Sequence, residues 1–156
     1  MGYRCVIVYL FIFGAGVSVA VHFSSRTADW ETPSALFDAL DAVHGPFDLD
    51  VCASPHNAKC PKFFTEKDDG LKKTWHGVCW MNPPYGRAIK KWMKKAYESS
   101  VGGATVVCLV PARTDTAWWH EYAMKGEVEF LRGRVKFVGA KSGAPFPSAI
   151  VVFRGR

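Results

Sequence analysis

Residues 78–86 read VCWMNPPYG, an apolar run that ends at an asparagine followed by two prolines. The run is typical of a short buried strand over 78–81. Pro83 and Pro84 cannot continue it, because proline has no amide hydrogen for the ladder. The tetrapeptide Asn82-Pro83-Pro84-Tyr85 therefore follows the carboxyl end of a strand. Since ligand sites in open α/β sheets lie at these ends, the stretch indicates both an architecture and a site.

The chain downstream of this stretch alternates helical and strand patterns. Residues 87–100, RAIKKWMKKAYESS, place apolar side chains at helical spacing with lysines around the other face, and Gly102-Gly103 predicts the helix end. Residues 105–110 form a second apolar run, typical of a buried strand, that ends at Pro111. We further expect a short helix over 116–124 and strands over 127–131, 134–138 and 148–153.

The segment upstream predicts one helix and two strands. Thr32 can cap a helix whose first position is Pro33, and Gly45-Pro46 ends that helix. Residues 47–53, FDLDVCA, alternate apolar side chains with an acidic face, which predicts a strand, and a shorter strand is expected at 63–64. Strands that alternate with helices predict an α/β fold with a mostly parallel sheet, and the late strands predict an antiparallel C-terminal edge.

The composition bounds the class of protein. A length of 156 residues fits one domain, and 49% apolar residues with only 22% charged residues exclude a disordered, collagen-like or coiled-coil chain. Five cysteines without a Cys-x-x-Cys pair argue against a disulfide framework or a zinc ribbon and favour reduced, cytosolic thiols. Cys52, His56 and Cys60 lack a fourth ligand at a recognisable spacing, so we expect no metal site.

Charge is distributed unevenly along the chain. Residues 1–70 carry 5 Lys and Arg against 9 Asp and Glu, a balance of −4, whereas residues 71–156 carry 15 against 5, a balance of +10. The second part therefore has the electrostatic character of a surface that meets a polyanion, and nucleic acid is the leading candidate. The alternative is that the lysines only solubilise an amphipathic helix.

Residues 1–28 form an apolar N-terminal extension to a domain that we place at 29–156. No charged residue occurs from Cys5 to Val21, and Ser18 with Ala20 resembles a cleavage site. Three interpretations are open: a signal or anchor, a buried N-terminal strand, or translated sequence upstream of the true start. We favour the third, because the polar stretch over 24–33 is typical of the beginning of a soluble domain.

The tetrapeptide at 82–85 has a specific chemical meaning. An exocyclic amine is a poor nucleophile because its lone pair is delocalised into the adjacent ring. If Asn82 Oδ1 and the Pro83 carbonyl both accept hydrogen bonds from that amine, positive charge that develops on nitrogen is stabilised. Proline's rigid ring fixes the direction of the carbonyl, and Tyr85 offers a flat face for an unstacked base. The methyl donor expected beside such a site is S-adenosylmethionine.

Several strings now identify a family. Between residues 29 and 153 the chain resembles the phage-type DNA N6-adenine methyltransferase family, nearly over its full length. The matching strings, in chain order, are DWETP, LFDAL, DLDVCAS, FFTEKDDGL, WMNPPYGR, PARTDT, GRVKF and PFPSA. The resemblance implies an abbreviated class I, Rossmann-like methyltransferase that transfers a methyl group from S-adenosylmethionine to a flipped adenine amine. It also implies catalytic roles for Asn82, Pro83, Pro84 and Tyr85.

The resemblance further implies a set of cofactor contacts. Thr32 and Pro33 resemble the N-terminal motif for the methionine moiety, and Asp50 with Cys52 belongs to the cofactor strand. Asp69 resembles the residue that accepts a hydrogen bond from the cofactor adenine; the alternative is a solvated turn aspartate. The chain departs from the general methyltransferase pattern because Ser54-Pro55 stands where a glycine-rich loop is usual.

Double-stranded DNA is the implied partner, and no separate recognition domain fits within this length. Loops 111–122 and 138–147 are the candidates for target recognition. Trp118 and Trp119 suit base stacking, although the core of a helix is an equal alternative. We expect a cytoplasmic monomer, in a bacterial or phage-infected cell, with no obligate protein partner. The residues expected to contact DNA are Arg87, Lys90, Lys91, Lys94, Arg113, Trp118 and Trp119.

Two other functions remain open at this stage. An NPPY-type enzyme can act on a protein glutamine or on RNA, and competition by duplex DNA distinguishes these substrates. An inactive prophage remnant that only binds DNA, or a membrane through residues 5–23, is the alternative from a different class. The intact tetrapeptide and the absence of charges within the predicted central strands favour an active enzyme.

Overall fold

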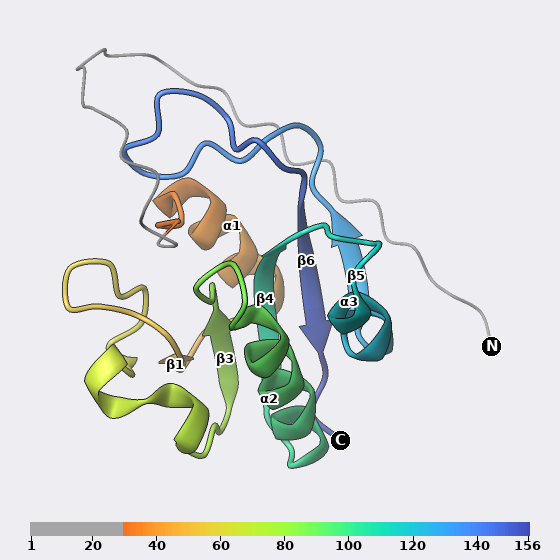
Figure 1. Ribbon diagram of the computed structural model, residues 1–156. Coiled ribbons are helices and arrows are strands. Elements are labelled where there is room, and N and C mark those ends of the chain that lie inside the picture. The colour runs from red at the N-terminus through yellow and green to blue at the C-terminus, as the bar shows by residue number, and fades with distance from the viewer. Residues whose placement is uncertain (1–29) are drawn as a thin grey trace.

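The computed structural model describes residues 30–156, so the predicted extension at 1–28 lies outside the described residues (Figure 1). Among the described residues no helix combines the length and apolar character needed to cross a membrane. Three short 3-10 turns occur at Glu66–Asp68, Gly70–Lys72 and Ala123–Lys125. The helices and strands are α1 (Ser34–His44), β1 (Leu49–Asp50), β2 (Lys62–Phe63), β3 (Val78–Met81), α2 (Ile89–Val101), β4 (Thr105–Pro111), α3 (Ala117–Glu121), β5 (Glu127–Phe130) and β6 (Ser148–Phe153).

The strands form one mixed sheet in the order β2-β1-β3-β4-β6-β5. The first four strands in this order are parallel, and β6 runs antiparallel between β4 and β5. The predicted parallel centre and antiparallel C-terminal edge are therefore confirmed. Because β1 and β3 are parallel neighbours, with Asp50 opposite Trp80, the residues that follow both strands meet at one edge of the sheet.

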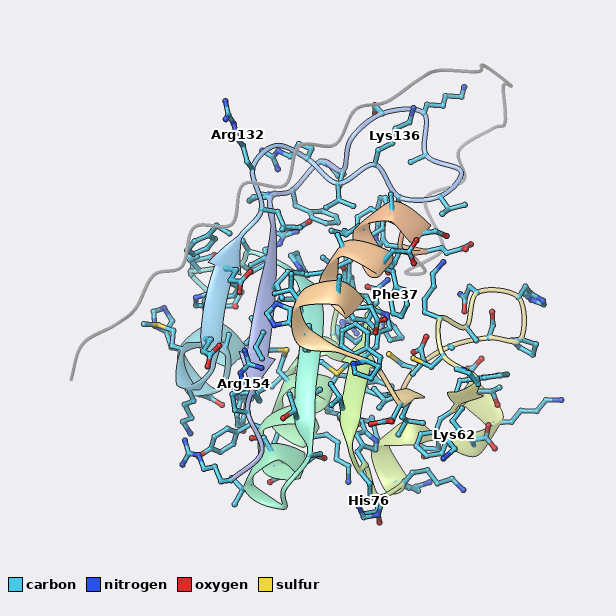
Figure 2. The ribbon with its side chains drawn as sticks, turned by 180° about the vertical axis from the view of Figure 1, so that it is seen from behind. Phe37, Lys62, His76, Arg132, Lys136 and Arg154 are labelled. Carbon is cyan, nitrogen blue, oxygen red and sulfur yellow. The ribbon has the colours of Figure 1, made fainter. Side chains whose placement is uncertain are left out.

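Helices cover both faces of the sheet. The alternation of side chains along β4 divides the core, since Val107 and Leu109 pack with α1 residues such as Leu36, whereas Val106 and Cys108 pack with α2 and α3. Figures 1 and 2 show these two sides, and Phe37 of α1, labelled in Figure 2, packs edge-on against Trp80 of β3 with ring centroids 5.4 Å apart. The result is a three-layer α/β arrangement that leaves the carboxyl ends of the parallel strands open to loops.

Local patterns account for the best-predicted elements. Strand β3 has the predicted bounds. Helix α2 begins two residues after the predicted start and ends at Val101, and the N–H of the following Gly102 donates to the Glu98 carbonyl. Gly103 has a φ of 100°, a conformation that glycine adopts without strain. The buried face of α2 includes Trp92, Met93 and Ala96, as the apolar spacing predicts.

Two local predictions are wrong, and the strand predicted over 47–53 is reduced to Leu49–Asp50. The helix begins at Ser34 with Pro33 at its N-cap and no side-chain cap, because the Thr32 hydroxyl is used elsewhere, as a partner of Asn82. Residues 134–138 do not form a strand. The backbone of this segment bonds to loops instead: the N–H of Val138 donates to the Glu31 carbonyl, and the Val135 carbonyl accepts the N–H of Ala144.

Candidate functional site

A pocket lies at the carboxyl ends of β1 and β3, where the fold predicts a ligand site. Three separate parts of the chain reach it: the segment before α1, the loop after β1, and the tetrapeptide after β3. Its lining residues are Trp30, Glu31, Thr32, Asp50, Cys52, Asn57, Lys59, Trp80, Asn82, Pro83 and Pro84. The predicted catalytic residues Asn82, Pro83 and Pro84 thus share one pocket with the predicted cofactor residues Thr32, Asp50 and Cys52.

The Asn82 amide is held in one orientation by residues about 50 positions earlier in the chain. Its Nδ2 donates to the Trp30 carbonyl and to Thr32 Oγ1, the latter at 3.0 Å. A backbone carbonyl only accepts hydrogen bonds, so the NH2 end of the amide must face Trp30. The other end, Oδ1, is buried and has no hydrogen-bond partner among residues 30–156. Asn82 therefore presents an unused acceptor, the atom that the proposed amine chemistry requires.

Asp50 is the second polar group of the pocket and the last residue of β1. It is 3% exposed, and its carboxylate accepts the N–H of Lys59 at 3.1 Å and of Cys52 at 3.3 Å. Burial raises the pKa of this carboxyl to about 6, against a usual value of 3.8, and the two backbone hydrogen bonds offset only part of that effect. At neutral pH the pocket therefore contains a largely buried anion, which favours a cationic ligand group.

An ion pair on the pocket wall was not predicted. Lys59 Nζ lies 3.6 Å from Glu31 Oε1, and the lysine side chain is only 13% exposed. Asn57 closes the loop between β1 and Lys59, because its Oδ1 accepts a hydrogen bond from the N–H of Ser54 at 2.7 Å. Nothing in the local pattern of residues 54–59 marks Lys59 as functional. Trp30 and Glu31, by contrast, belong to the DWETP string, in which only the threonine and proline were assigned a role.

Tyr85 has a different environment from its neighbours in the tetrapeptide. Its hydroxyl donates to the Leu109 carbonyl at 3.3 Å, and burial raises the pKa of the phenol. The ring makes edge contacts with Phe137 and Phe146, at centroid distances of 6.2 and 5.6 Å. It does not line the pocket described above. Stacking of a base on Tyr85 thus stays a prediction. The base would then lie beside the pocket, against the aromatic cluster that Tyr85 forms with Phe137 and Phe146.

The remaining cofactor candidates lie near the pocket without lining it. Pro33 follows the lining residue Thr32 directly. Asp69, with a φ of 52°, forms an ion pair with Lys72 at 2.9 Å. The next residue, Gly70, packs so closely on β1 that an added Cβ would lie 2.2 Å from the Val51 carbonyl oxygen. Asp69 is therefore held beside the end of the predicted cofactor strand, although outside the pocket.

The residues predicted to contact DNA fall into three groups. Arg87, Lys91 and Arg113 are exposed, while Lys90 pairs with Glu121 at 2.8 Å and Lys94 with Glu98 at 3.6 Å. Trp118 and Trp119 are only 6% and 3% exposed and belong to the core beneath α2. Their burial agrees with the alternative interpretation of the two tryptophans, in which they belong to the core of a helix. The short helix α3 buries both rings, so neither is available to stack on a base.

Titratable residues do not gather into a metal site in the described part of the chain. No group of three His, Cys, Asp or Glu side chains there is placed to hold an ion. Cys52, Cys60, Cys79 and Cys108 are free thiols, and burial raises the pKa of each.

Comparison with known proteins gives a consistent result. The family model described as DNA N-6-adenine-methyltransferase (Dam) matches residues 22–152. A DNA N-6-adenine-methyltransferase of Escherichia phage T1 is 36% identical over 132 residues, which cover 73% of this chain and 55% of that protein. One of Haemophilus phage HP1 is 30% identical over 118 residues, covering 73% of this chain and 68% of the relative. The chain thus spans about half to two thirds of the length of these relatives.

Proposed function

Because the chain belongs to the DNA N-6-adenine-methyltransferase family, we propose that it is an enzyme that methylates the N6 amine of adenine in double-stranded DNA, with S-adenosylmethionine as the donor. The observation that carries this proposal is the Asn82 amide, whose NH2 end is occupied and whose Oδ1 is buried and unpaired. A primary amine is the group that can satisfy such an acceptor together with the adjacent Pro83 carbonyl.

Asn82 and Pro83 act on the target amine. When both oxygens accept hydrogen bonds from this amine, its lone pair turns out of conjugation with the ring. Positive charge that develops on the nitrogen in the transition state is then stabilised. The acceptor is oriented before the substrate arrives, so little reorganisation is needed during the reaction. Tyr85, fixed by its hydrogen bond to Leu109, is proposed to form part of the surface against which the extruded base lies.

The pocket fits the charged end of the cofactor. When bound, S-adenosylmethionine supplies an electrophilic methyl group. The buried Asp50 carboxylate is complementary to an α-ammonium group, and the Lys59 ammonium, which pairs with Glu31 on the pocket wall, is complementary to an α-carboxylate. Thr32, Pro33 and Cys52 are the proposed neighbours of this end, and Asp69 is the proposed partner of the cofactor adenine. Loop 54–59 takes the place of the usual glycine-rich loop.

The sheet supports an abbreviated class I, Rossmann-like methyltransferase fold. Its parallel strands carry helices on both faces, and the pocket lies at their carboxyl ends. Arg87, Lys91 and Arg113 are proposed phosphate contacts because they are exposed and basic. We further propose that residues 29–156 form the methyltransferase domain, which acts as a monomer in the cytoplasm, where the DNA is.

One experiment tests the proposal directly. The full chain is incubated with S-adenosylmethionine carrying a labelled methyl group and DNA from a methylation-deficient host, and the nucleosides are then separated. Label in N6-methyladenine, abolished by Asn82→Ala, is the expected result. Label that appears instead in protein glutamine or RNA, and is not reduced by competing duplex DNA, would overturn the proposed substrate. No transfer to any of these substrates would support an inactive remnant.

A further inference from the structure

The segment that joins β5 to β6, residues 131–147, is called the basic loop here. Figure 1 shows it passing over the same end of the sheet as the loop that follows β3. It contains four cations and no acidic residue. All four are exposed: Arg132, Arg134, Lys136 and Lys141.

The cations of the basic loop are unpaired within the described residues, unlike two of the four lysines of α2. Among residues 30–156, none of the four forms an ion pair, whereas Lys90 and Lys94 each have a glutamate partner. Figure 2 shows Arg132 and Lys136 projecting away from the body of the protein. Unpaired, exposed cations on an acid-free segment produce a local positive potential that attracts a polyanion.

The basic loop is also joined to the catalytic pocket. Val135 and Phe137 are buried, so the residues between and beside them turn outward. Phe137 and Phe146 pack against Trp30 with centroid distances of 5.2 and 5.3 Å, and the Trp30 carbonyl accepts the hydrogen bond that orients Asn82. The Glu31 carbonyl accepts the N–H of Val138 at 3.0 Å. A phosphate backbone held by the basic loop would thus lie at a fixed position relative to Asn82.

We propose that the basic loop is the main surface that binds the phosphates of duplex DNA, and that its aromatic contacts set the position of the duplex relative to the Asn82 pocket. This inference rests on the proposed function for the identity of the polyanion. It assigns to residues 131–147 the electrostatic role that the sequence favours for the lysine face of α2. The paired lysines of α2 contribute less, because a cation already neutralised by a carboxylate releases fewer counterions when it meets a phosphate.

Salt dependence of DNA binding tests the assignment. The loop variant carries Arg132→Gln, Arg134→Gln, Lys136→Gln and Lys141→Gln. The matched control neutralises four exposed cations elsewhere, with Lys62→Gln, Lys67→Gln, Lys73→Gln and Arg156→Gln. The dissociation constant for a fluorescent random-sequence duplex is measured for each between 50 and 300 mM salt. Binding of S-adenosylmethionine by calorimetry and the circular dichroism spectrum report whether the pocket and the fold remain intact.

The expected result is specific to the loop variant. Each lost phosphate contact should reduce the slope of log affinity against log salt by about 0.9, so four contacts correspond to a change of about 3.6. The control should differ by no more than about one contact, and cofactor affinity should be unchanged in both. If the fourfold loop variant does not fold, the double variant Arg132→Gln with Lys136→Gln, whose side chains point outward, should still reduce the slope by about 1.8.

The outcomes separate the inference from the proposed function. If the wild-type chain methylates DNA but the loop variant and the control have equal slopes, the inference is wrong and the function stands. If the loop variant loses its salt-dependent binding and the wild-type chain methylates no adenine, the inference stands and the function is wrong. Failure of the wild-type chain to bind duplex DNA at all would overturn the inference.

Discussion

The hydrogen bond between Asn82 Nδ2 and Thr32 Oγ1, 3.0 Å long, leads to a prediction for the variant Thr32→Val. Valine has nearly the shape of threonine but replaces the acceptor hydroxyl with a methyl group. The NH2 end of Asn82 then keeps only the Trp30 carbonyl, and one of its amide hydrogens is left buried without a partner. The amide loses its fixed orientation, so Oδ1 no longer faces the target amine in every molecule.

The magnitude follows from the lost interaction. A buried donor left without a partner costs about 1–3 kcal/mol, and loss of an oriented acceptor raises the activation barrier by a similar amount. The rate of methyl transfer should therefore fall by roughly 5- to 100-fold. Thr32 is 2% exposed, so water cannot readily replace the missing hydroxyl. Thr32→Ser, which keeps an acceptor at this position, should retain a rate within a few-fold of the wild type.

The assay is single-turnover methyl transfer at saturating cofactor and DNA, with cofactor affinity measured separately by calorimetry. If Thr32 acts through Asn82, Thr32→Val lowers the rate at saturation while the dissociation constant for S-adenosylmethionine changes little. In the Asn82→Ala background the same substitution should have almost no further effect, because the group that it positions is gone. A large loss of cofactor affinity with an unchanged rate at saturation would refute this reasoning and support the direct cofactor contact implied by the sequence.

Four further predictions concern the pocket and the adjacent Tyr85. Asn82→Ala should lower the rate by a hundredfold or more, on the order of 3 kcal/mol, with cofactor affinity retained; near wild-type turnover would contradict the mechanism. Because the pKa of Asp50 is about 6, its anion is lost below that pH, so cofactor affinity should fall as pH is lowered from 7 to 5, and this dependence should vanish in Asp50→Asn. For the stability of the unliganded protein the sign is opposite. Because the folded-state pKa of Asp50 is raised from 3.8 to about 6, its contribution to stability is complete below pH 3.8 and is lost as pH rises through 6. The free energy of unfolding, measured with urea, should therefore fall by up to about 3 kcal/mol over this range, and Asp50→Asn should not show this fall. Tyr85→Ala should keep cofactor binding but reduce the fluorescence signal that an adenine analogue in DNA gives on extrusion, because about 1–3 kcal/mol of base stacking is lost. Loss of cofactor affinity with normal extrusion would show that Tyr85 belongs to the cofactor site instead of the base site.

Elements with a strong local pattern could be predicted from the sequence. The apolar run at 78–81, ended by two prolines, is typical of a short buried strand, and β3 has these bounds. The spacing of Trp92, Met93 and Ala96 defines the buried face of α2 in the same way. In each case the physical signal lies within a few residues, in backbone hydrogen bonding or in side-chain periodicity, so no knowledge of distant segments is needed.

The errors came from positions where the same local pattern has two physical outcomes. Alternating apolar residues at 134–138 bury Val135 and Phe137 as a strand would, but the backbone of this segment bonds to the loops at Glu31 and Ala144 and joins no sheet edge. The adjacent tryptophans of α3 could stack on a base or pack in the core, and their packing against α2 places them in the core. Local sequence carries no information on which edges and faces are already occupied.

The sequence by itself therefore determined the α/β class, the parallel centre of the sheet and the position of Asn82 at the end of β3. Only the tertiary structure decided what surrounds Asn82. Trp30 and Thr32 orient its amide from about 50 residues away, and the ion pair of Glu31 with Lys59 borders its pocket. These contacts depend on which strands are neighbours and on the loops packed over their ends. Such long-range hydrogen bonds follow from the completed topology, whereas strands and helices follow from short-range periodicity.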